Sequence, residues 1–254
     1  MRVKIKGRLL CTEYIWFESF SSKKEIKSNA PRVCIQANPA KLSKNSKLQH
    51  TLVSRLDDMD TELLINTFSS TVRNEIRRAE RDGVECKVFT SNDLAVNHGM
   101  IDAFADTYRE MYAEKGLNCS LEMRSVEAYI KNNVFVLTVA YVDGKPCVFH
   151  SYVVDDTHSR LLHSCSKFRV QDNSMKNSIG RANKLLHYKD MQYLSGLGII
   201  SYDWGGISSF EKPNGIDKFK MSFGGTPVDY YNCFVNLSLK AKLISIYNGI
   251  FARK

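Results

Sequence analysis

The sequence lacks any long apolar run. No segment of its 254 residues approaches the length needed to span a bilayer. The basic start MRVKIKGRLL leads into Cys11, Thr12 and Glu13 without the apolar core of a secretion signal. These absences argue against a membrane-spanning or exported protein. We therefore expect a cytoplasmic protein, with the inner face of the membrane as the one membrane surface open to it.

Paired metal or disulfide motifs are also missing. The seven cysteines are an odd number and include no CxxC pair, so neither a disulfide framework nor a zinc site is indicated. His150, His163 and His187 have no third ligand at a suitable spacing, and a half-buried histidine with satisfied hydrogen bonds is the simpler interpretation of each. We expect no metal and no tightly bound cofactor.

Positive charge is concentrated at one end of the chain. The formal net charge is +9, and residues 1–50 carry 11 Lys and Arg against 3 Asp and Glu, or +8 of that total. Such a surface suits a polyanionic partner such as RNA, a diphosphate-linked substrate or an anionic membrane face. A solvated lysine-rich edge that serves solubility is an equally good explanation of the charge alone.

The first part of the chain predicts a small β substructure. Alternating segments predict strands at 9–17, 32–37 and 51–56, with a polar loop at 40–49. From residue 60 the apolar period becomes helical. The pattern then predicts helices within 60–83, 94–115 and 125–132, with a strand at 84–89. We expect two parts, a basic β-rich part at 1–60 and a main domain at 61–254.

The strongest β signal follows at residues 134–167. Three apolar runs are separated by Asp143-Gly144-Lys145 and Asp155-Asp156-Thr157, which have the composition of hairpin turns. The sequence predicts a meander of antiparallel strands at 134–142, 146–154 and 160–167. Beyond a polar loop it predicts a helix, a strand, a short helix, a strand and a last amphipathic helix, at 179–195, 199–203, 216–222, 228–236 and 239–251. The last helix could contact a membrane surface, although closing the core is its simpler role.

Four segments carry a resemblance to a known family. They are SSTVRNEIRRAERDGVECKVF, FADTYREMYAEKGL, IGRANKLLHYKDMQYLSGLGIISYDWGGI and NGIDKFKMSFGGTPVDYY, beginning at residues 69, 104, 179 and 214. They resemble the FemABX-type acyltransferases and the related acetyltransferase-like proteins of bacterial surface-polysaccharide loci, within the class of Gcn5-related N-acetyltransferases (GNAT). The resemblance spans about residues 65–235. It implies an α+β GNAT fold, with a mixed, mostly antiparallel sheet flanked by helices.

The resemblance also implies an activity, the transfer of an acyl or aminoacyl group to an amine. The expected function is an N-acyltransferase that uses acyl-CoA as cosubstrate and acts on the amine of a sugar in a nucleotide- or lipid-linked cell-envelope glycan precursor. An aminoacyl-tRNA-dependent transferase is the alternative among enzymes, and the basic residues 1–50 favour it. A noncatalytic RNA-binding module on a degenerate GNAT fold is the alternative of another class.

Lys220 is the residue that the resemblance marks most sharply. In this family a Phe-Lys pair, here Phe219 and Lys220, lies beside the acyl-transfer centre, and the lysine is thought to stabilise developing negative charge. The physics is sound, since amine attack on an ester or thioester creates an oxyanion that a fixed cation stabilises. Lys218 could meet substrate phosphate as a point charge. A solvated basic helix face is the competing interpretation of both lysines.

Three further residues are candidates near the same strand end. Asp203 precedes a double glycine, and it either deprotonates and orients the acceptor amine or caps the turn that follows. Tyr202 beside it is assigned to the substrate site, with core packing as the alternative. His150 is a candidate base, because its predicted strand borders the acceptor cleft in this fold.

The last candidates are phosphate contacts. We expect Ser178 to precede a helix amino terminus at which Gly180, Arg181, Ala182 and Asn183 cradle the pyrophosphate of coenzyme A. An ordinary capped helix fits the same residues equally well, because the acetyl-CoA signature is not spelled out. Arg77 lies on a predicted helix with alternating charges and is a secondary candidate for phosphate contact.

Overall fold

The computed structural model describes residues 1–57, 61–168 and 172–251. The chain forms two compact units, the first comprising Met1–Thr51 and Val228–Lys254 and the second Leu52–Pro227. This division differs from the predicted parts 1–60 and 61–254, because the end of the chain belongs with its beginning. The cause is strand pairing: β10 (Thr226–Asn236) runs antiparallel to β3 (Arg32–Asn38), with Val235 opposite Val33.

The first unit is built on paired strands. β1 (Arg2–Lys6) is antiparallel to β2 (Cys11–Trp16), and β2 is parallel to β3. A short 3-10 helix, η1 (Lys23–Glu25), lies between β2 and β3, and α8 (Leu239–Phe251) follows β10 with the predicted bounds. The apolar core consists of Ile15, Phe20, Ile26, Val33, Ile35, Cys233 and Val235. The sequence pattern missed β1, and β4 (Lys47–Arg55) begins inside the predicted loop 40–49.

The second unit contains the predicted meander. Its strand order is β4-β9-β8-β7-β6-β5, with β5 (Glu85–Thr90), β6 (Phe135–Val142), β7 (Lys145–Val154), β8 (His158–Ser166) and β9 (Ser201–Ile207). Strands β5 to β8 are antiparallel, and β9 is parallel to β8. The turn between β6 and β7 is tight because Asp143 and Gly144 adopt φ of 51° and 73°. Since both turn residues need a left-handed backbone, the Asp-Gly pair predicted this hairpin correctly.

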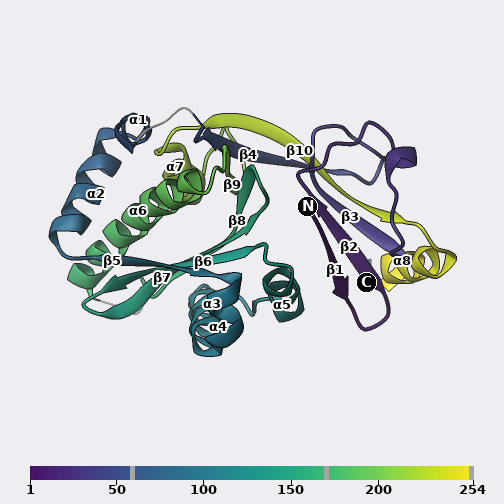
Figure 1. Ribbon diagram of the computed structural model, residues 1–254, viewed down its shortest axis with the longest axis horizontal. Helices are drawn as coiled ribbons and strands as arrows, with labels where there is room; N and C mark the ends of the chain where they lie inside the picture. Colours follow the sequence, from purple (N-terminus) through teal and green to yellow (C-terminus); the bar gives the residue numbers. More distant parts are fainter. Residues whose placement is uncertain (58–60, 169–171, 252–254) are drawn as a thin grey trace. The chain divides into compact units, whose positions relative to one another are not determined.

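Helices cover both faces of this sheet (Figure 1). On one face lie α2 (Ser70–Arg81) and α6 (Asn173–Gly196), and on the other lie α3 (Ser91–Val96), α4 (His98–Ala113) and α5 (Met123–Lys131). Two short helices, α1 (Thr61–Asn66) and α7 (Gly215–Met221), complete the unit. The predicted helix 94–115 is in fact two helices, divided at Asn97, and α6 starts six residues earlier than predicted.

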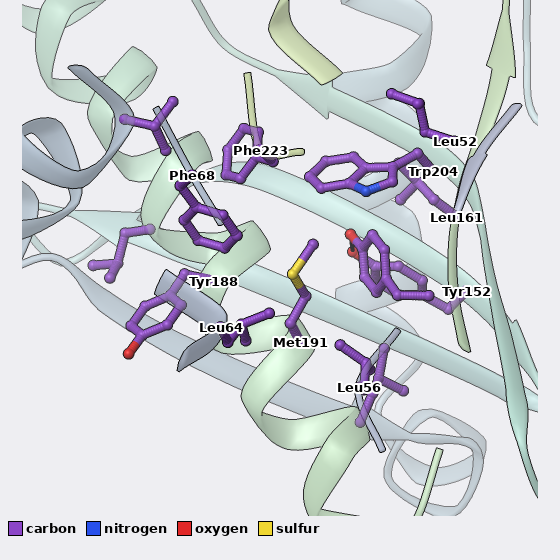
Figure 2. Close-up of a cluster of buried hydrophobic side chains, with 14 of the residues drawn as sticks. Leu52, Leu56, Leu64, Phe68, Tyr152, Leu161, Tyr188, Met191, Trp204 and Phe223 are labelled. Carbon is purple, nitrogen blue, oxygen red and sulfur yellow. Dashed lines mark hydrogen bonds between the residues drawn. The ribbon is translucent and has the colours of Figure 1, made fainter. Parts of the chain in front are cut away.

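The core of the second unit lies between α6 and the sheet. Figure 2 shows Phe68, Phe223 and Trp204 above Met191 of α6, with Tyr152 beside Met191 and Leu56 below it. Phe68 and Phe223 meet edge to face with ring centroids 5.0 Å apart, and Trp204 packs on Phe223 at 4.8 Å. These contacts fix α7 and the end of β9 against α6, which sets the position of the side chains described below.

Within the described part of the chain, no helix combines the length and the apolar character required to cross a membrane.

Candidate functional site

A cavity of about 260 Å³ lies in the second unit. β8 pairs with β9 only from His158–Ser201 to Arg160–Asp203, and the cavity is lined by the part of β8 beyond that stretch together with α4, α6 and α7. Its lining residues are Met111, Lys115, Leu161, Ser164, Cys165, Ser166, Asn183, His187, Gly215, Ile216, Phe219 and Lys220. A second cavity of about 320 Å³ shares five of these residues and adds Phe168, Ile179, Gly180 and Lys184. The two form one continuous groove.

Lys220 is held at this groove by the way α7 begins. The Asn214 side chain accepts hydrogen bonds from the N–H groups of Ile216 and Asp217, and Asp217 reaches back to the N–H of Asn214 at 3.1 Å. Asp217 also accepts the N–H of Ser208 at 3.0 Å, which ties α7 to the chain after β9. Lys220 therefore comes to lie where its Nζ donates to the carbonyl of Gly206 at 2.8 Å.

The environment of the Lys220 amine disfavours its charge. Burial, reinforced by the nearby Arg160 guanidinium, lowers the pKa of Lys220 from 10.5 to about 8, and Asp203 and Asp217 oppose this only partly. A cation that is incompletely solvated and fixed at a cavity is well suited to stabilise negative charge on a bound molecule.

Gly205 allows the strand end and the lysine to come together. Its φ is 73°, and a Cβ added there would lie 2.9 Å from the carbonyl oxygen of Leu161 and 3.8 Å from Nζ of Lys220. A side chain at this position would meet backbone that cannot yield cheaply. The first glycine of the pair is thus required by the close approach of β9 to β8.

A chain of hydrogen bonds runs behind the cavity through the core. Nδ1 of His187 bonds to the hydroxyl of Tyr202 at 2.8 Å, and that hydroxyl bonds to the hydroxyl of Tyr152 at 2.8 Å. Tyr152 donates to Oδ2 of Asp190 at 2.5 Å, and Asp190 bonds to Nδ1 of His150 at 2.7 Å. All five side chains are buried. We call this set the core relay.

Comparisons with known proteins identify the fold. No protein-family model and no curated protein matches the sequence. The solved structure of FemX matches with a TM-score of 0.61 and 14% identity, over 92% of this chain and 84% of FemX. The C-terminal DUF2156 domain of a putative lysylphosphatidylglycerol synthetase from Agrobacterium fabrum matches with a TM-score of 0.56 and 14% identity, over 96% and 83%. L-PGS from Bacillus licheniformis matches with a TM-score of 0.50 and 11% identity, over 87% and 74%.

The chain has a FemABX-like GNAT fold. The predicted fold class is thereby confirmed, including the mixed, mostly antiparallel sheet flanked by helices. Because the identities are this low, the likeness concerns the fold, and the roles of individual residues must be argued from their surroundings in this chain.

Four predicted site residues line the groove: Phe219 and Lys220, and also Gly180 and Asn183 on α6. Phe219 and Lys220 line the cavity from α7, and the ring of Phe219 stands 5.5 Å from Nζ of Lys184 and 5.6 Å from the ring of His187. Lys218 and Arg77, by contrast, are exposed on α7 and α2 and are not among the residues that line the groove. Helical spacing explains the difference between Lys218 and Lys220, since residues two apart point to different faces.

The predicted role of Asp203 as a base is corrected by its position. Asp203 is buried away from the cavity lining; its Oδ2 accepts a hydrogen bond from Arg160 at 2.5 Å, and its Oδ1 accepts the N–H of Gly205 at 2.8 Å. A carboxylate paired in this way stabilises the turn at the double glycine. The alternative role, as the residue that forms this turn, is the one that the geometry supports.

His150 and Tyr202 were also predicted at the substrate, and both lie in the core relay instead. His150 is fully buried, with Nδ1 on Asp190 and Nε2 on Asn183, each at 2.7 Å. Tyr202 is fully buried as well and bonds to Tyr152 and His187. Neither lines the cavity, because both side chains point from the sheet into the layer beneath α6.

The predicted pyrophosphate cradle is not a helix start. α6 begins at Asn173 with Asp172 as its N-cap, so Gly180, Arg181, Ala182 and Asn183 lie inside the helix, where their N–H groups belong to the helical ladder. Arg181 pairs with Asp82 at 3.1 Å, and Ala182 is buried. Gly180 and Asn183 do line the groove, but they do so from the side of α6 and not with free N–H groups at a helix start. The carboxylate of Asp172 caps the true start, and its charge opposes a phosphate there.

The charged side chains among the described residues that line the groove are all positive. Lys115, Lys184 and Lys220 line it, and the described residues of its lining include no Asp or Glu. Lys184 is also paired with Glu75 at 2.9 Å. Such a lining favours a ligand with negative charge.

Potential metal ligands occur together at one place in the described residues. Ligand atoms of His150, His187 and Asp190 lie within 4.8 Å of one another. These atoms belong to the core relay, where a metal ion would have to replace hydrogen bonds that already exist. The expectation that the protein binds no metal stays a prediction.

Sequence reasoning missed His187 as a site residue. Asn183, His187 and Asp190 recur at helical spacing on α6, among residues that are otherwise buried and mostly apolar. A polar stripe on a buried helix face was the available signal, since buried polar groups must find partners.

Proposed function

We propose that this chain is an acyltransferase that moves an aminoacyl group from the ester of an aminoacyl-tRNA to an amine, with the acyl carbonyl bound beside Lys220. The observation that carries the proposal is the Lys220 ammonium, half-buried at the groove and anchored 2.8 Å from the Gly206 carbonyl. The sequence resemblance to FemABX-type proteins, which implies that Phe219 and Lys220 are the family's Phe-Lys pair, supports the same role. For the acceptor we propose the amine of a cell-envelope glycan precursor.

The chemistry asked of the site is modest. The amine nitrogen attacks the ester carbonyl, a C–N bond forms, and the carbonyl oxygen becomes an oxyanion. Lys220 stabilises that charge, and a fixed donor of this kind is worth about 10²–10³-fold in rate. Collapse of the intermediate breaks the C–O bond; the amine nitrogen gives up one proton, and the leaving ribose oxygen gains one and departs as the hydroxyl of the tRNA.

The choice of tRNA over acyl-CoA as donor has three supports. The residues expected to cradle the coenzyme A pyrophosphate lie inside α6, and the true helix start carries the acidic Asp172. The groove is lined by three lysines without a carboxylate among the described lining residues, which suits the phosphates near the end of a tRNA. By its name, the lysylphosphatidylglycerol synthetase that shares the fold is also concerned with an aminoacyl group.

The test is a transfer assay with both donors. Radiolabelled aminoacyl-tRNA, charged with a mixture of amino acids, or radiolabelled acetyl-CoA is incubated with hydroxylamine or glucosamine as the amine. We expect amide products from the tRNA donor, and a loss of about 10²-fold or more for Lys220→Met. Lys212→Met, which removes an exposed lysine outside the groove lining, is the matched control and should retain activity.

Binding measurements decide between the donors independently of turnover. Affinity for tRNA that falls steeply with added salt supports the proposal. Binding and transfer with acetyl-CoA but not with charged tRNA would reassign the donor to acyl-CoA. Absence of transfer from either donor would overturn the acyltransferase function.

A further inference from the structure

The core relay reaches the groove directly at one end and through a bonded neighbour, Asn183, at the other. His187 lines the cavity at one end, and Asn183 lines it at the other, bonded to Nε2 of His150. Between them every side chain of the relay is buried, and Asp190 also lines a separate cavity of about 310 Å³. A buried chain of this length is costly unless each hydrogen bond is made in one consistent direction.

The direction of the hydrogen bonds follows from the number of protons. A carboxylate can only accept hydrogen bonds, so Tyr152 must donate its single hydroxyl hydrogen to Asp190. In its hydrogen bond with Tyr202, at 2.8 Å, Tyr152 can therefore only be the acceptor, and Tyr202 donates its own hydroxyl hydrogen. The oxygen of Tyr202 must in turn accept from His187, whose Nδ1 is 2.8 Å away. The relay therefore places the ring hydrogen of His187 on Nδ1.

This assignment leaves Nε2 of His187 with a lone pair. Within residues 1–57, 61–168 and 172–251, Nε2 has no hydrogen-bond partner, and it is not one of the fully buried polar atoms left unsatisfied. Since His187 lines the cavity, Nε2 is the atom that it offers there. Lys220 lines the same cavity, so a molecule bound there would meet both side chains.

We propose that His187 is the general base of the reaction: Nε2 takes the proton of the acceptor amine, and the core relay passes a proton from Nδ1 to Asp190. This assignment rests on the proposed acyl transfer. It replaces His150, which cannot reach a substrate.

The proton count closes. The N–H bond of the acceptor breaks and a bond to Nε2 forms, while the Nδ1 proton moves to Tyr202, the Tyr202 proton to Tyr152, and the Tyr152 proton to Asp190. His187 ends neutral with its hydrogen on Nε2, both tyrosines end neutral, and Asp190 ends protonated. Oδ1 of Asp190 is buried and has no hydrogen-bond partner in the described part of the chain.

The surroundings explain why a relay is needed. Burial, the stacked ring of His150 3.9 Å away, Lys220 and Lys184 lower the pKa of His187 well below its ordinary 6.5. A lasting imidazolium is therefore disfavoured, and a proton gained at Nε2 must be balanced by one lost at Nδ1. Burial and the charge of Asp190 raise the pKa values of Tyr152 and Tyr202 well above 10, so both stay hydroxyls that can pass a proton on.

The first test needs no substrate. Long-range ¹H–¹⁵N spectra of the ¹⁵N-labelled protein distinguish the two neutral tautomers of a histidine, and His187→Gln assigns the signals of His187 among the six histidines. We expect hydrogen on Nδ1, the rarer tautomer in free histidine. Hydrogen on Nε2 would overturn the base role and leave the proposed acyl transfer intact.

The second test separates a base from a structural residue. At about neutral pH ethanolamine is protonated and hydroxylamine is largely neutral, so only ethanolamine needs a base to lose a proton before attack. His187→Gln should slow transfer to ethanolamine about 10²-fold and transfer to hydroxylamine much less. His163→Gln, a half-buried histidine outside the relay and the cavity lining, is the control and should slow neither.

Equal slowing of both acceptors by His187→Gln would contradict the base role, since a structural defect does not depend on the acceptor. If the unaltered protein transfers to neither amine, the proposed function itself fails and the base role with it. The tautomer measurement tells these two failures apart, because it concerns the ring of His187 alone.

Discussion

Replacing Lys220 by methionine should show how much the charge of this partly buried lysine lowers the free energy of unfolding. The amine is held in a partly buried environment in which its pKa is lowered from 10.5 to about 8. The folded protein therefore disfavours the charged lysine relative to the unfolded chain. Lys220→Met keeps most of the apolar side chain and removes the charge, so it should remove this electrostatic cost at neutral pH.

The size of the effect follows from the pKa values. At about 1.4 kcal/mol for each pH unit, a fall from 10.5 to about 8 corresponds to about 3 kcal/mol of destabilisation below pH 8. Because water still reaches part of the side chain, we expect about 1–3 kcal/mol. Loss of the hydrogen bond to Gly206 subtracts a constant of about 1–2 kcal/mol at neutral pH.

The experiment tests the direction in which the difference in free energy of unfolding between the two proteins changes with pH. Below about pH 8 the lysine is charged in both states and its full cost is present. As pH rises from about 8 to 10.5, the folded lysine loses its proton while the unfolded one keeps it, and the cost disappears. The free energy of unfolding of the original protein should therefore rise relative to that of Lys220→Met over this range.

Urea unfolding of both proteins at about pH 7 and pH 10 measures this difference, and other titrating groups cancel in the comparison. Lys212→Met, at an exposed site, should show the same offset at both pH values. If the curves of the original protein and Lys220→Met keep a constant separation, the lowered pKa is refuted. The argument that Lys220 is an incompletely solvated cation, suited to stabilise negative charge, would then fail as well.

Further outcomes follow from the local geometry. Gly205→Ala should lower the free energy of unfolding by about 1–3 kcal/mol in urea unfolding, because φ is 73° and a Cβ would meet the Leu161 carbonyl at 2.9 Å. Arg160→Met should cost about 3–5 kcal/mol in the same assay by leaving the buried Asp203 carboxylate without the Arg160 guanidinium, and adding Asp203→Leu should restore part of that loss. Gly180→Ala should raise the melting temperature, since it lies inside a helix and a Cβ has room there, with a gain of about 0.5–1 kcal/mol; a loss of transfer activity in this variant would speak for the backbone cradle that the structure argues against. The transfer rate of the original protein should fall as pH rises through about 8, measured with hydroxylamine, because Lys220 must be charged; a rate that rises instead would make it a base.

Local features of the sequence carried much of the fold. The meander β6–β8 was predictable because Asp143 and Gly144 enforce a tight turn between two strongly apolar strands. The short helix α7 was predictable too, since Asn214 and Asp217 form its capping box within four residues. Turns and helix caps of this kind depend on residues that are neighbours in the sequence, so the local sequence pattern is enough to predict them.

Boundaries that depend on distant partners were not predictable in this way. The polar run before residue 179 looked like a loop, yet it forms the first turns of α6 under the Asp172 cap. β10 and α8 were assigned to the main domain, but β10 pairs with β3 near the other end of the chain. Pairing between strands far apart in sequence leaves no local mark on either strand.

The resemblance of four sequence segments implied the FemABX-like GNAT fold, and the capping residues after the glycine-rich strand end determined where α7 begins and so where Lys220 lies along it. The tertiary structure decided which polar residues meet the groove. It placed His187 there and moved His150, Tyr202 and Asp203 into the core. The reason is physical: which side of a strand or helix faces a cavity depends on the layers packed against it, and those layers come from the whole chain.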